Sequence, residues 1–420
     1  MTASHLRRCD AFTHTAGDRA MNRKLNIAVV GAGFNHGSDG RENWGVRTHL
    51  PALKALPDLF NVVAVCTSHM ESARESAERF EVPHTFDDYN KLMQLPGLDA
   101  VTVVVRPKLH FPVVMAALQA GKHVYCEWPL ALSAAQAGEM ADLAERKGVV
   151  SATGTQGHYM PQAERMREMI KEGFIGRPLL FGASMFVSNY IVPRPAHRQW
   201  LFQAAEGGNQ AYRAGHMLER VVSTLGEVKE LSADLTQLVR ERRLLGAQGT
   251  LQGDQIDNMN FLLKLANGVS GTLQVSWTSW FGTGQKFEVY GTEGMLMLAK
   301  PQRDEVSELT NDPGYLEAGE LFGARVDMLQ VLRASKPPEA TLRDIQPIPM
   351  RDPDDLHAST LTPYGSAYVV RRAFRAFAGA INGGKAYDPD FRTGQRLHEL
   401  LEAAELSVRE KRWVDTPQRI

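Results

Sequence analysis

The first part of the chain alternates short β-branched hydrophobic runs with stretches that favour helix. The runs fall at residues 25–30, 60–66, 99–105, 122–126 and 149–152. Between them, helix-favouring stretches fall at residues 44–56, 71–80, 112–120 and 133–147. Strands that are hydrophobic throughout and separated by helices are typical of a parallel sheet with right-handed crossover connections. We therefore expect a first domain over residues 23–150, built on a parallel sheet.

The hydrophobic pattern changes after residue 150. Strand-like segments follow one another at residues 179–188, 228–238, 259–265, 269–276 and 286–290. Asn267-Gly268, between two of these segments, is a strong signal for a hairpin turn. Helical periodicity returns at residues 160–172, 209–225, 364–381 and 394–410, whereas residues 301–361 are polar and contain several prolines. The second domain, residues 151–420, is therefore expected to be α+β, with a large and mostly antiparallel open sheet.

Composition narrows the class of protein. The chain has 420 residues, a formal net charge of −1 and 43% hydrophobic residues, which is ordinary for a globular protein of two or three domains. This charge gives no reason to expect nucleic acid as a partner, and no hydrophobic run is long enough to cross a bilayer. Three widely spaced cysteines (Cys9, Cys66 and Cys126) argue against a disulfide framework or a metal site, so a cytoplasmic location is expected. Residues 1–22 are polar and are expected to form a disordered tail.

A glycine turn directly follows the first strand. Gly31 and Gly33, followed by Phe34, match the first two glycines of a dinucleotide-binding turn, which lets the backbone approach a pyrophosphate. The third glycine of that pattern is out of register, so the signal is weak by itself. The second strand ends without the acidic residue that would bind a ribose 2′-hydroxyl. Ser68 and Arg74 near that end are more compatible with a 2′-phosphate, which favours NADP over NAD or permits both.

Two later strand ends carry further candidate groups. Residues 106–110 read Arg-Pro-Lys-Leu-His, and residues 127–129 read Glu-Trp-Pro. The carboxyl ends of parallel strands meet at one edge of an open α/β sheet, where ligands bind in such folds. Arg106 and Lys108 could orient an anionic or hydroxylated ligand there, or could be solvated surface charges. The Glu-Trp-Pro segment could also be an ordinary strand-to-helix turn closed by its proline.

Taken together, these segments resemble the glucose–fructose oxidoreductase and inositol dehydrogenase family, written Gfo/Idh/MocA. Their order and spacing match that family, and Gly207-Gly208 with His216 and the turn at residues 291–294 continue the match. A closer likeness is to the branch that contains the fungal galactose-regulon repressor. It is carried by residues 43–52, Glu127-Trp128, Gln156-Gly157 and residues 312–315.

The resemblance implies an N-terminal Rossmann domain that binds NADP or NAD, and a C-terminal α+β domain whose open sheet forms oligomer contacts. The activity it implies is oxidoreduction of a sugar, a polyol or a related cyclic hydroxyl or carbonyl compound, carried out by a dimer or tetramer. The residues expected to hold the cofactor are Gly31, Gly33, Phe34, Ser68, Arg74, Arg106, Pro107, His110, Glu127 and Trp128.

The sequence departs from the family at two catalytic positions. Typical members have Glu-Lys-Pro at the central turn, and that lysine handles the hydroxyl proton; Trp128 stands in its place here. They also place an aspartate four residues before a histidine, and here Tyr212 precedes His216. An indole N–H only donates hydrogen bonds and does not transfer a proton at neutral pH. Proton transfer is therefore expected from His216, assisted by Tyr212 on the same helix face or by Lys108.

The remaining candidates are expected around a ring-shaped substrate. Trp128 could stack against a sugar ring or a nicotinamide, or could be a core residue. Gln156, His158 and Tyr159 follow the last parallel strand, and together with Trp200 they are expected to line the substrate pocket, although loop packing would also explain them. Because the lysine is missing, two other functions stay open. One is a dinucleotide-binding regulatory protein without turnover, and the other is a non-redox lyase or hydrolase with a retained cofactor.

Overall fold

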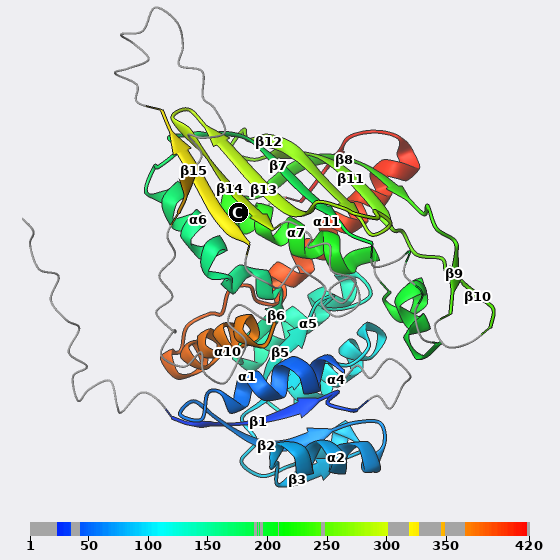
Figure 1. The fold of residues 1–420 in the computed structure, drawn as a ribbon. Helices are drawn as coiled ribbons and strands as arrows, with labels where there is room; N and C mark the ends of the chain where they lie inside the picture. The colour runs from blue at the N-terminus through cyan, green and yellow to red at the C-terminus, as the bar shows by residue number, and fades with distance from the viewer. Residues whose placement is uncertain are drawn as a thin grey trace, which may run out of the picture.

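The computed structural model describes residues 23–34, 43–188, 191, 193, 196–208, 210–244, 248–300, 319–326, 346–348 and 366–417. The expected tail at residues 1–22 and most of the polar stretch at residues 301–361 lie outside the described residues. Within them the chain forms two large sheets, one in each half of the molecule, which Figure 1 shows one above the other.

The N-terminal half is a parallel sheet with the strand order β3-β2-β1-β4-β5-β6. Its strands are β1 (Leu25–Val30), β2 (Phe60–Cys66), β3 (His84–Phe86), β4 (Ala100–Val103), β5 (His123–Glu127) and β6 (Ser151–Gly154). All neighbouring pairs run parallel. The order reverses between β1 and β4, and ligands bind at such a switch point. The expected Rossmann fold is confirmed, and the expected boundary at residue 150 falls just before β6.

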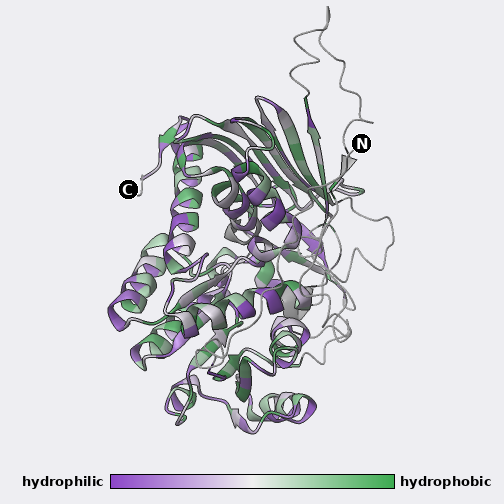
Figure 2. Ribbon diagram, turned by 90° about the vertical axis from the view of Figure 1, so that its left-hand side faces the viewer, coloured by the Kyte–Doolittle hydropathy of each residue, from purple (hydrophilic) through white to green (hydrophobic). Residues whose placement is uncertain are grey.

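Helices cover both faces of this sheet because its strands are hydrophobic on both sides. Leu25, Ile27 and Val29 of β1 belong to one hydrophobic core, whereas Ala28 and Val30 belong to the other. The first core is closed by α1 (Leu50–Lys54), α2 (Met70–Phe80) and α10 (Ser366–Gly383), and the second by α3 (Tyr89–Leu92), α4 (His110–Gln119) and α5 (Ala134–Lys147). In Figure 2 the helices carry both hydrophilic and hydrophobic residues, as elements with one face on a sheet should.

The helix after the glycine turn begins with a π-helical turn. The sequence predicts a helix over residues 44–56 that Pro51 must bend or delay. In the structure η2 (Gly45–His49) comes first, and the N–H of Leu50 donates to the carbonyl of Gly45. Pro51 then lies in the first turn of α1, where a missing N–H costs nothing. The regular α-helix is therefore delayed until after η2.

The C-terminal half is a nine-stranded sheet in the order β16-β15-β14-β13-β7-β12-β11-β8-β17. Its strands are β7 (Pro178–Phe186), β8 (Val228–Thr236), β11 (Asn258–Leu265), β12 (Ser270–Ser276), β13 (Gly284–Gly291), β14 (Gly294–Lys300), β15 (Glu320–Arg325), β16 (Gln346–Pro347) and β17 (Val414–Asp415). All neighbouring pairs are antiparallel except β7 with β12. The predicted hairpin at Asn267-Gly268 joins β11 to β12, and the expected mostly antiparallel sheet is confirmed.

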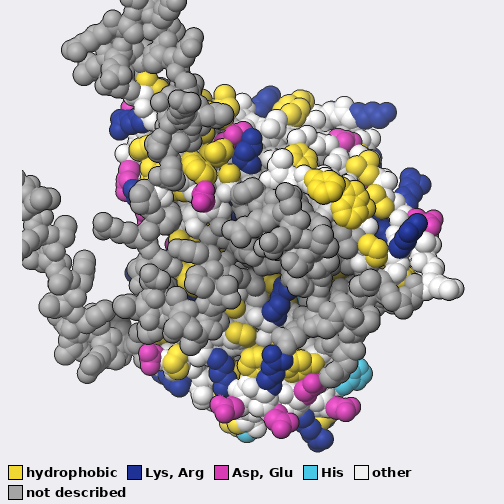
Figure 3. Space-filling view, viewed as in Figure 1, with side chains coloured by type: hydrophobic (Ala, Val, Ile, Leu, Met, Phe, Trp, Pro, Cys, Tyr) yellow, Lys and Arg dark blue, Asp and Glu magenta, His cyan; other side chains and the backbone are white. Residues whose placement is uncertain are grey.

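One face of the nine-stranded sheet is covered by helices, namely α6 (Pro161–Lys171), α7 (Gln210–Leu225) and α11 (Phe391–Glu410). Figure 1 shows these helices between the large sheet and the N-terminal half. Along β7, buried Phe181, Ala183 and Met185 face them and alternate with more exposed neighbours. The opposite face is covered by no described helix, and Figure 3 shows hydrophobic side chains exposed around this sheet.

Short elements complete the fold around the sheets. A separate ribbon pairs β9 (Glu241–Arg243) with β10 (Thr250–Gln252). The 3₁₀ helices are η3 (Pro107–Leu109), η4 (Gln156–Tyr159), η5 (Ala196–Phe202) and η6 (Ala204–Glu206). Two of them, η3 and η4, directly follow the parallel strands β4 and β6, so they lie at the carboxyl edge of that sheet.

The last two long helices connect the two halves. In α10 the ring of Phe374 lies with its centroid 5.4 Å from that of His49 and 4.9 Å from that of Tyr125, so this helix packs on the N-terminal half. Helix α11 packs against both α5 of the N-terminal half and β8 of the large sheet. Residues near the end of the chain thus complete the core of the first domain.

The joint between the two halves is built around Trp128. Its side chain is 1% exposed, and a Cβ added to Gly215 of α7 would lie 2.2 Å from an indole carbon. The ring of His398 in α11 lies 4.7 Å from the indole, centroid to centroid. Nε2 of His398 accepts a hydrogen bond from the backbone N–H of Ala131 at 3.2 Å. Trp128 therefore fills the space between the end of β5 and two helices of the other half.

Two glycines in helices provide a test of this joint. We expect Gly215→Ala to destabilise the protein by about 1–3 kcal/mol, because the new methyl group overlaps the indole and forces the packing apart. Gly379→Ala is the matched control, since nothing lies within 4 Å of a Cβ at this position in α10. It should stabilise the protein by about 0.5–1 kcal/mol through helix propensity. Urea unfolding measures both, and equal effects of the two changes would refute the tight packing on Trp128.

His398 makes stability depend on pH in a defined direction. Burial, together with the nearby His110, lowers the pKa of His398 to about 3. The unfolded chain binds a proton at this histidine below its ordinary value near 6.5, whereas the folded chain does not until about pH 3. Its contribution to stability is therefore complete above pH 6.5 and is lost as the pH falls. Wild type should lose about 1.4 kcal/mol per pH unit more steeply than His398→Gln between pH 6 and 4. Parallel curves of unfolding free energy against pH would contradict this.

Candidate functional site

The glycine turn has no room for side chains. Gly31 has φ +107°, and a Cβ built on it would lie 2.5 Å from the carbonyl oxygen of Val104. Its N–H donates to the carbonyl of Cys66 at 2.8 Å, which ties the turn to the end of β2. A Cβ on Gly33 would lie 2.9 Å from Oγ of Ser72 in α2. Only glycine fits at Gly31, whereas a side chain at Gly33 would require the Ser72 hydroxyl to move. A bare backbone turn at the end of β1 is what close approach of a pyrophosphate requires.

The groups around this turn are exposed. Ser68, after β2, and Arg74, in α2, are both exposed to solvent, as the cofactor hypothesis requires. The structure adds a cation that sequence reasoning missed: the guanidinium carbon of Arg79 lies 5.0 Å from the ring centroid of Phe34. Arg79 lies far along α2, and nothing in its spacing links it to the turn, so only the folded helix reveals it.

A buried carboxylate lies at the end of β5. Oε1 of Glu127 lies 2.8 Å from Nε2 of His49, and it accepts a hydrogen bond from Nε2 of Gln156 at 2.6 Å. His49 is fully buried, and its Nδ1 lies 2.8 Å from Oγ1 of Thr102 in β4. This network joins the helix after the glycine turn, two strands and η4. His49 belongs to the segment at residues 43–52, but no spacing rule connects it to Glu127.

The segment after β4 contacts the other half of the molecule. Nζ of Lys108 lies 2.5 Å from Oε1 of Glu206 in η6, and Nη1 of Arg106 lies 3.8 Å from Oε2 of the same carboxylate. The guanidinium carbon of Arg106 lies 6.0 Å from the ring centroid of Trp200 in η5. Gly207, with φ +72°, lies so close to Pro107 that a Cβ would be 2.4 Å from the proline side chain. The cations expected at a ligand therefore share one carboxylate that bridges the halves.

His110 is held at the core side of this segment. Its Nδ1 lies 2.8 Å from the carbonyl oxygen of Pro129 and its Nε2 lies 3.1 Å from that of Val105. Burial lowers the pKa of His110 from its ordinary value, although both carbonyls favour protonation. His110 thus connects the strand ends of β4 and β5 rather than facing solvent.

Helix α7 brings the second half to this edge. Gly215 lies against Trp128, and the next residue, His216, is partly buried. The backbone of Tyr212 lies one turn earlier in α7, while its side chain lies outside the described residues. The helix also packs on η4, where Nδ1 of His158 lies 2.7 Å from Oε1 of Glu219. Glu219 was not among the sequence candidates, because a lone acidic residue in a helix carries no signal.

Tyr159 turns away from the buried carboxylate. Its hydroxyl donates to the carbonyl of Asp388 at 2.6 Å, and its ring lies 5.6 Å from that of Tyr387. Both partners belong to the link between α10 and α11. Burial raises the pKa of Tyr159, so its phenol stays protonated at neutral pH. Of the three η4 candidates, Gln156 reaches Glu127, His158 reaches α7, and Tyr159 reaches the C-terminal link.

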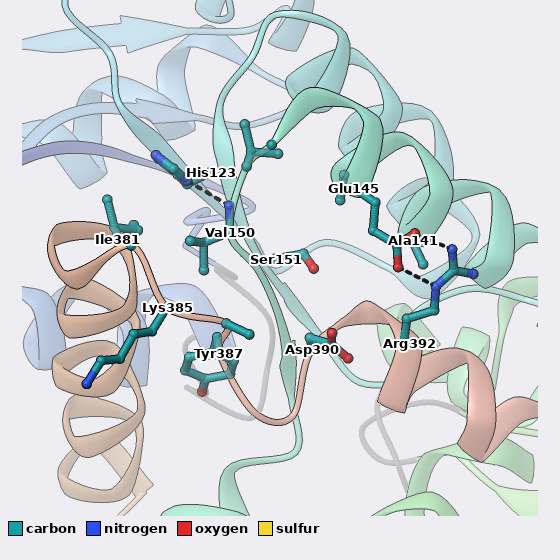
Figure 4. Close-up of a pocket in the computed structure, with 15 residues that line it drawn as sticks. His123, Ala141, Glu145, Val150, Ser151, Ile381, Lys385, Tyr387, Asp390 and Arg392 are labelled. Atoms are coloured by element: carbon teal, nitrogen blue, oxygen red, sulfur yellow. Dashed lines mark hydrogen bonds and ion pairs between the residues drawn. The ribbon is translucent and has the colours of Figure 1, made fainter. Parts of the chain in front are cut away.

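A cavity of about 330 Å³ lies at the opposite edge of the parallel sheet (Figure 4). It is lined by the starts of β5 and β6, by α5 and by the link between α10 and α11. Nδ1 of His123 accepts a hydrogen bond from the N–H of Val150 at 2.9 Å, and Arg392 pairs with Glu145 at 2.6 Å. Ligands of this fold bind at the carboxyl ends of the strands. The cavity therefore lies at the wrong edge for the expected ligand.

Two features are absent from the part of the chain that the structure describes. None of the described helices is long and apolar enough to cross a membrane. The described residues contain no group of three or more histidine, cysteine or acidic side chains that could hold a metal ion.

Curated relatives are found among sugar and polyol dehydrogenases. Levoglucosan dehydrogenase of Pseudarthrobacter phenanthrenivorans is 24% identical, over 94% of this chain and 99% of its own length. Myo-inositol 2-dehydrogenase of Thermotoga maritima is 27% identical, over 63% of this chain and 75% of its own length.

Solved structures share the fold over nearly the whole chain. Levoglucosan dehydrogenase in complex with NADH and levoglucosan has a TM-score of 0.77 at 23% identity, covering 94% of this chain and 100% of that one. A super-repressor mutant of Gal80p from Saccharomyces cerevisiae has a TM-score of 0.74 at 17% identity, covering 94% and 98%.

Sequence profiles match both halves of the molecule. Residues 25–155 match the oxidoreductase family with an NAD-binding Rossmann fold, and residues 163–297 match the GFO/IDH/MocA C-terminal domain. The two matches follow the parallel sheet and most of the nine-stranded sheet. The chain therefore belongs to the Gfo/Idh/MocA oxidoreductase family.

Proposed function

We propose that the protein is an NAD(P)-dependent oxidoreductase acting on a sugar, a polyol or a related cyclic hydroxyl or carbonyl compound. The observation that carries this proposal is the glycine turn, in which a Cβ at Gly31 would clash with the backbone of Val104. A turn without side chains at the switch point of a parallel sheet suits a dinucleotide, which supplies a hydride acceptor or donor when it is bound. The dehydrogenases among its relatives support a polyhydroxylated substrate.

The residues of the chain have separate roles in this proposal. Gly31, Gly33 and Phe34 hold the dinucleotide at the end of β1. Glu127, fixed between His49 and Gln156, presents a rigid carboxylate that can accept hydrogen bonds from hydroxyl groups of a ligand. The remaining candidates after β4 (Arg106, Pro107, Lys108 and His110) position the cofactor and the second half around it. His216 of α7 is proposed to contact the reacting hydroxyl, with Tyr212 in support.

The cofactor preference follows from the end of β2. With no carboxylate there to repel a 2′-phosphate, Ser68 and the exposed cations Arg74 and Arg79 are compatible with NADP and do not exclude NAD. We therefore propose that NADP or NAD is used, with NADP slightly favoured.

A second candidate function is that of a protein that binds the dinucleotide but catalyses no reaction. It is favoured by Trp128, which occupies the position of the proton-carrying lysine and is buried in the joint between the halves. An indole there stabilises the contact between the domains but transfers no proton. A dinucleotide-binding regulatory protein is consistent with this exchange.

The assay of function separates these proposals. We expect purified protein to bind NADH or NADPH and to change nicotinamide absorbance with a member of a panel of sugars, polyols and cyclic diols. His216→Ala should lower kcat by about 10²–10⁴-fold while leaving the Kd for the cofactor within a few-fold, because it removes a group that contacts only the reacting hydroxyl. If the protein binds the cofactor tightly but turns over no compound of the panel, the enzymatic proposal is wrong and the regulatory function is favoured. If kcat is unchanged in His216→Ala, the proposed contact of His216 with the reacting hydroxyl is wrong.

We also propose that the uncovered face of the large sheet associates with a second copy of the chain. Leu180 of β7, Tyr290 of β13 and Met295 of β14 are cross-strand neighbours in one row. Leu180 is 49% exposed and Tyr290 is 37% exposed, so the row presents hydrophobic area that no described helix covers. A homodimer would bury it on both copies by one isologous contact.

Sedimentation velocity tests this association. Leu180→Asp should convert the wild-type dimer or tetramer into a smaller species, because a charge would be buried in the contact. Leu238→Asp is the matched control, since Leu238 is 57% exposed but lies beyond the end of β8. A monomeric wild type, or loss of assembly in both variants alike, would contradict the proposed surface.

A further inference from the structure

A histidine–carboxylate pair lies beside the candidate site. Nδ1 of His158 in η4 lies 2.7 Å from Oε1 of Glu219 in α7. The side chain of Glu219 is 3% exposed, whereas that of His158 is 12% exposed. Nε2 of His158 makes no hydrogen bond with any described residue, so one ring nitrogen is held by the protein and the other is available.

The charges around the pair fix the tautomer of the imidazole. Burial by itself would raise the pKa of Glu219, but His158, Arg167 and Arg220 together hold it below its ordinary value. Glu219 is therefore ionised at neutral pH and can only accept hydrogen bonds. Nδ1 of a neutral His158 must then carry the hydrogen and donate it to Glu219, which leaves the lone pair on Nε2.

The pair belongs to the same edge as the other candidates. Gln156, two residues before His158 in η4, donates to the carboxylate of Glu127 at the end of β5. In α7, His216 lies three residues before Glu219, which puts the two on one face of the helix. Helix α7 and η4 are packed together, so both histidines lie where the carboxyl edge of the sheet meets the second half.

The cations after β4 and the indole of Trp128 are poorly suited to receive a proton. Lys108 is engaged by Glu206 at 2.5 Å and Arg106 lies beside the same carboxylate. Trp128 only donates and is buried against Gly215. A histidine with one nitrogen bound to a carboxylate and the other open is the arrangement that general bases commonly use.

We propose that His158, oriented by Glu219, is the proton acceptor of the site when a substrate hydroxyl is oxidised. In this step the O–H bond breaks and its proton forms an N–H bond with Nε2 of His158. The C–H bond breaks with its electron pair leaving as hydride for the oxidised nicotinamide, and the carbon becomes a carbonyl. The inference rests on the proposed dehydrogenase function, in which His216 contacts the reacting hydroxyl, and it names His158 as the group that receives the proton in place of the missing lysine.

The imidazolium formed in this step is stabilised where it forms. Glu219 of α7 lies in direct contact, and Asp388 of the α10–α11 link interacts electrostatically with His158. Arg167 of α6 donates to the carbonyl of His158 at 2.6 Å, and Arg220 of α7 lies next to Glu219, so these cations partly oppose the acids. The contact with Glu219 dominates because it is the direct one. The partial exposure of His158 provides the path by which the proton reaches solvent.

The first test follows the imidazole itself and requires no turnover. In protein with ¹³C-labelled histidine, the His158 signal is assigned by its absence in His158→Gln, and its titration is compared with that in Glu219→Gln. The carboxylate in contact with Nδ1 stabilises the charged imidazole, so its removal should lower the titration midpoint relative to wild type. A midpoint that does not move would overturn the orienting role of Glu219.

The second test is kinetic and uses the substrate found in the panel. His158→Gln should lower kcat for oxidation by about 10²–10⁴-fold, with the Kd for NADH unchanged. Glu219→Gln should shift the acidic limb of the kcat/KM profile to lower pH, in step with the imidazole titration, which a merely structural pair would not do. His84→Gln, an exposed histidine in β3, is the control and should match wild type.

The outcomes separate this inference from the proposed function. An active wild type with an equally active, folded His158→Gln overturns the inference and leaves the dehydrogenase function standing. A wild type that binds NADH but oxidises nothing in the panel overturns both. Loss of activity in His158→Gln with partial recovery on adding free imidazole would support the assignment, because only a missing base is replaced in that way.

Discussion

The site depends on burying a carboxylate. Glu127 is 8% exposed at the end of a hydrophobic strand, and a buried carboxylate is tolerated only when hydrogen bonds replace its water. His49 and Gln156 provide these bonds from η2 and η4. Each partner is itself fixed, His49 by Thr102 and Gln156 by a short helix that packs on α7. The solvation requirement of one group thus sets the positions of the elements around the candidate ligand site.

Contacts at the same edge of the parallel sheet fix the position of the C-terminal half relative to the N-terminal half. Glu206 binds the cations after β4, Gly207 lies on Pro107, and Gly215 lies on Trp128. The contacts combine two exposed ion pairs that share Glu206 with two places where a glycine allows the backbone to come close. Ion pairs at the surface contribute little by themselves. The close glycine contacts therefore carry most of the specificity of this joint, and the lysine-to-tryptophan exchange is part of it.

Local patterns in the sequence predicted much of the fold. Most strands of both sheets and the hairpin at Asn267-Gly268 could be recognised because β-branched runs and turn residues are short-range signals. The short strands β3, β16 and β17 were not predicted, and neither was β15, which with β16 lies in the stretch at residues 301–361 that was expected to be polar. The docking of α10 on the first sheet could not, since it joins Phe374 to Tyr125 across most of the chain. The glycine turn was recognisable for the same local reason. The partners of the candidate site were not: His49 and Glu127 are 78 positions apart, and Glu219 has meaning only next to His158.

The position of α10 has a consequence for how the chain acquires its structure during synthesis. Leu25, Ile27 and Val29 of the first strand share a core with Val370 and Phe377 of α10. Helices α1 and α2 cover only part of this face of the first sheet, and the part under α10 stays uncovered until the ribosome has made residues 366–383. During that interval the nascent first domain exposes hydrophobic surface of the kind that chaperones bind. The first strand of the chain is therefore among the first residues to be made, but its core is completed only after α10 has been translated.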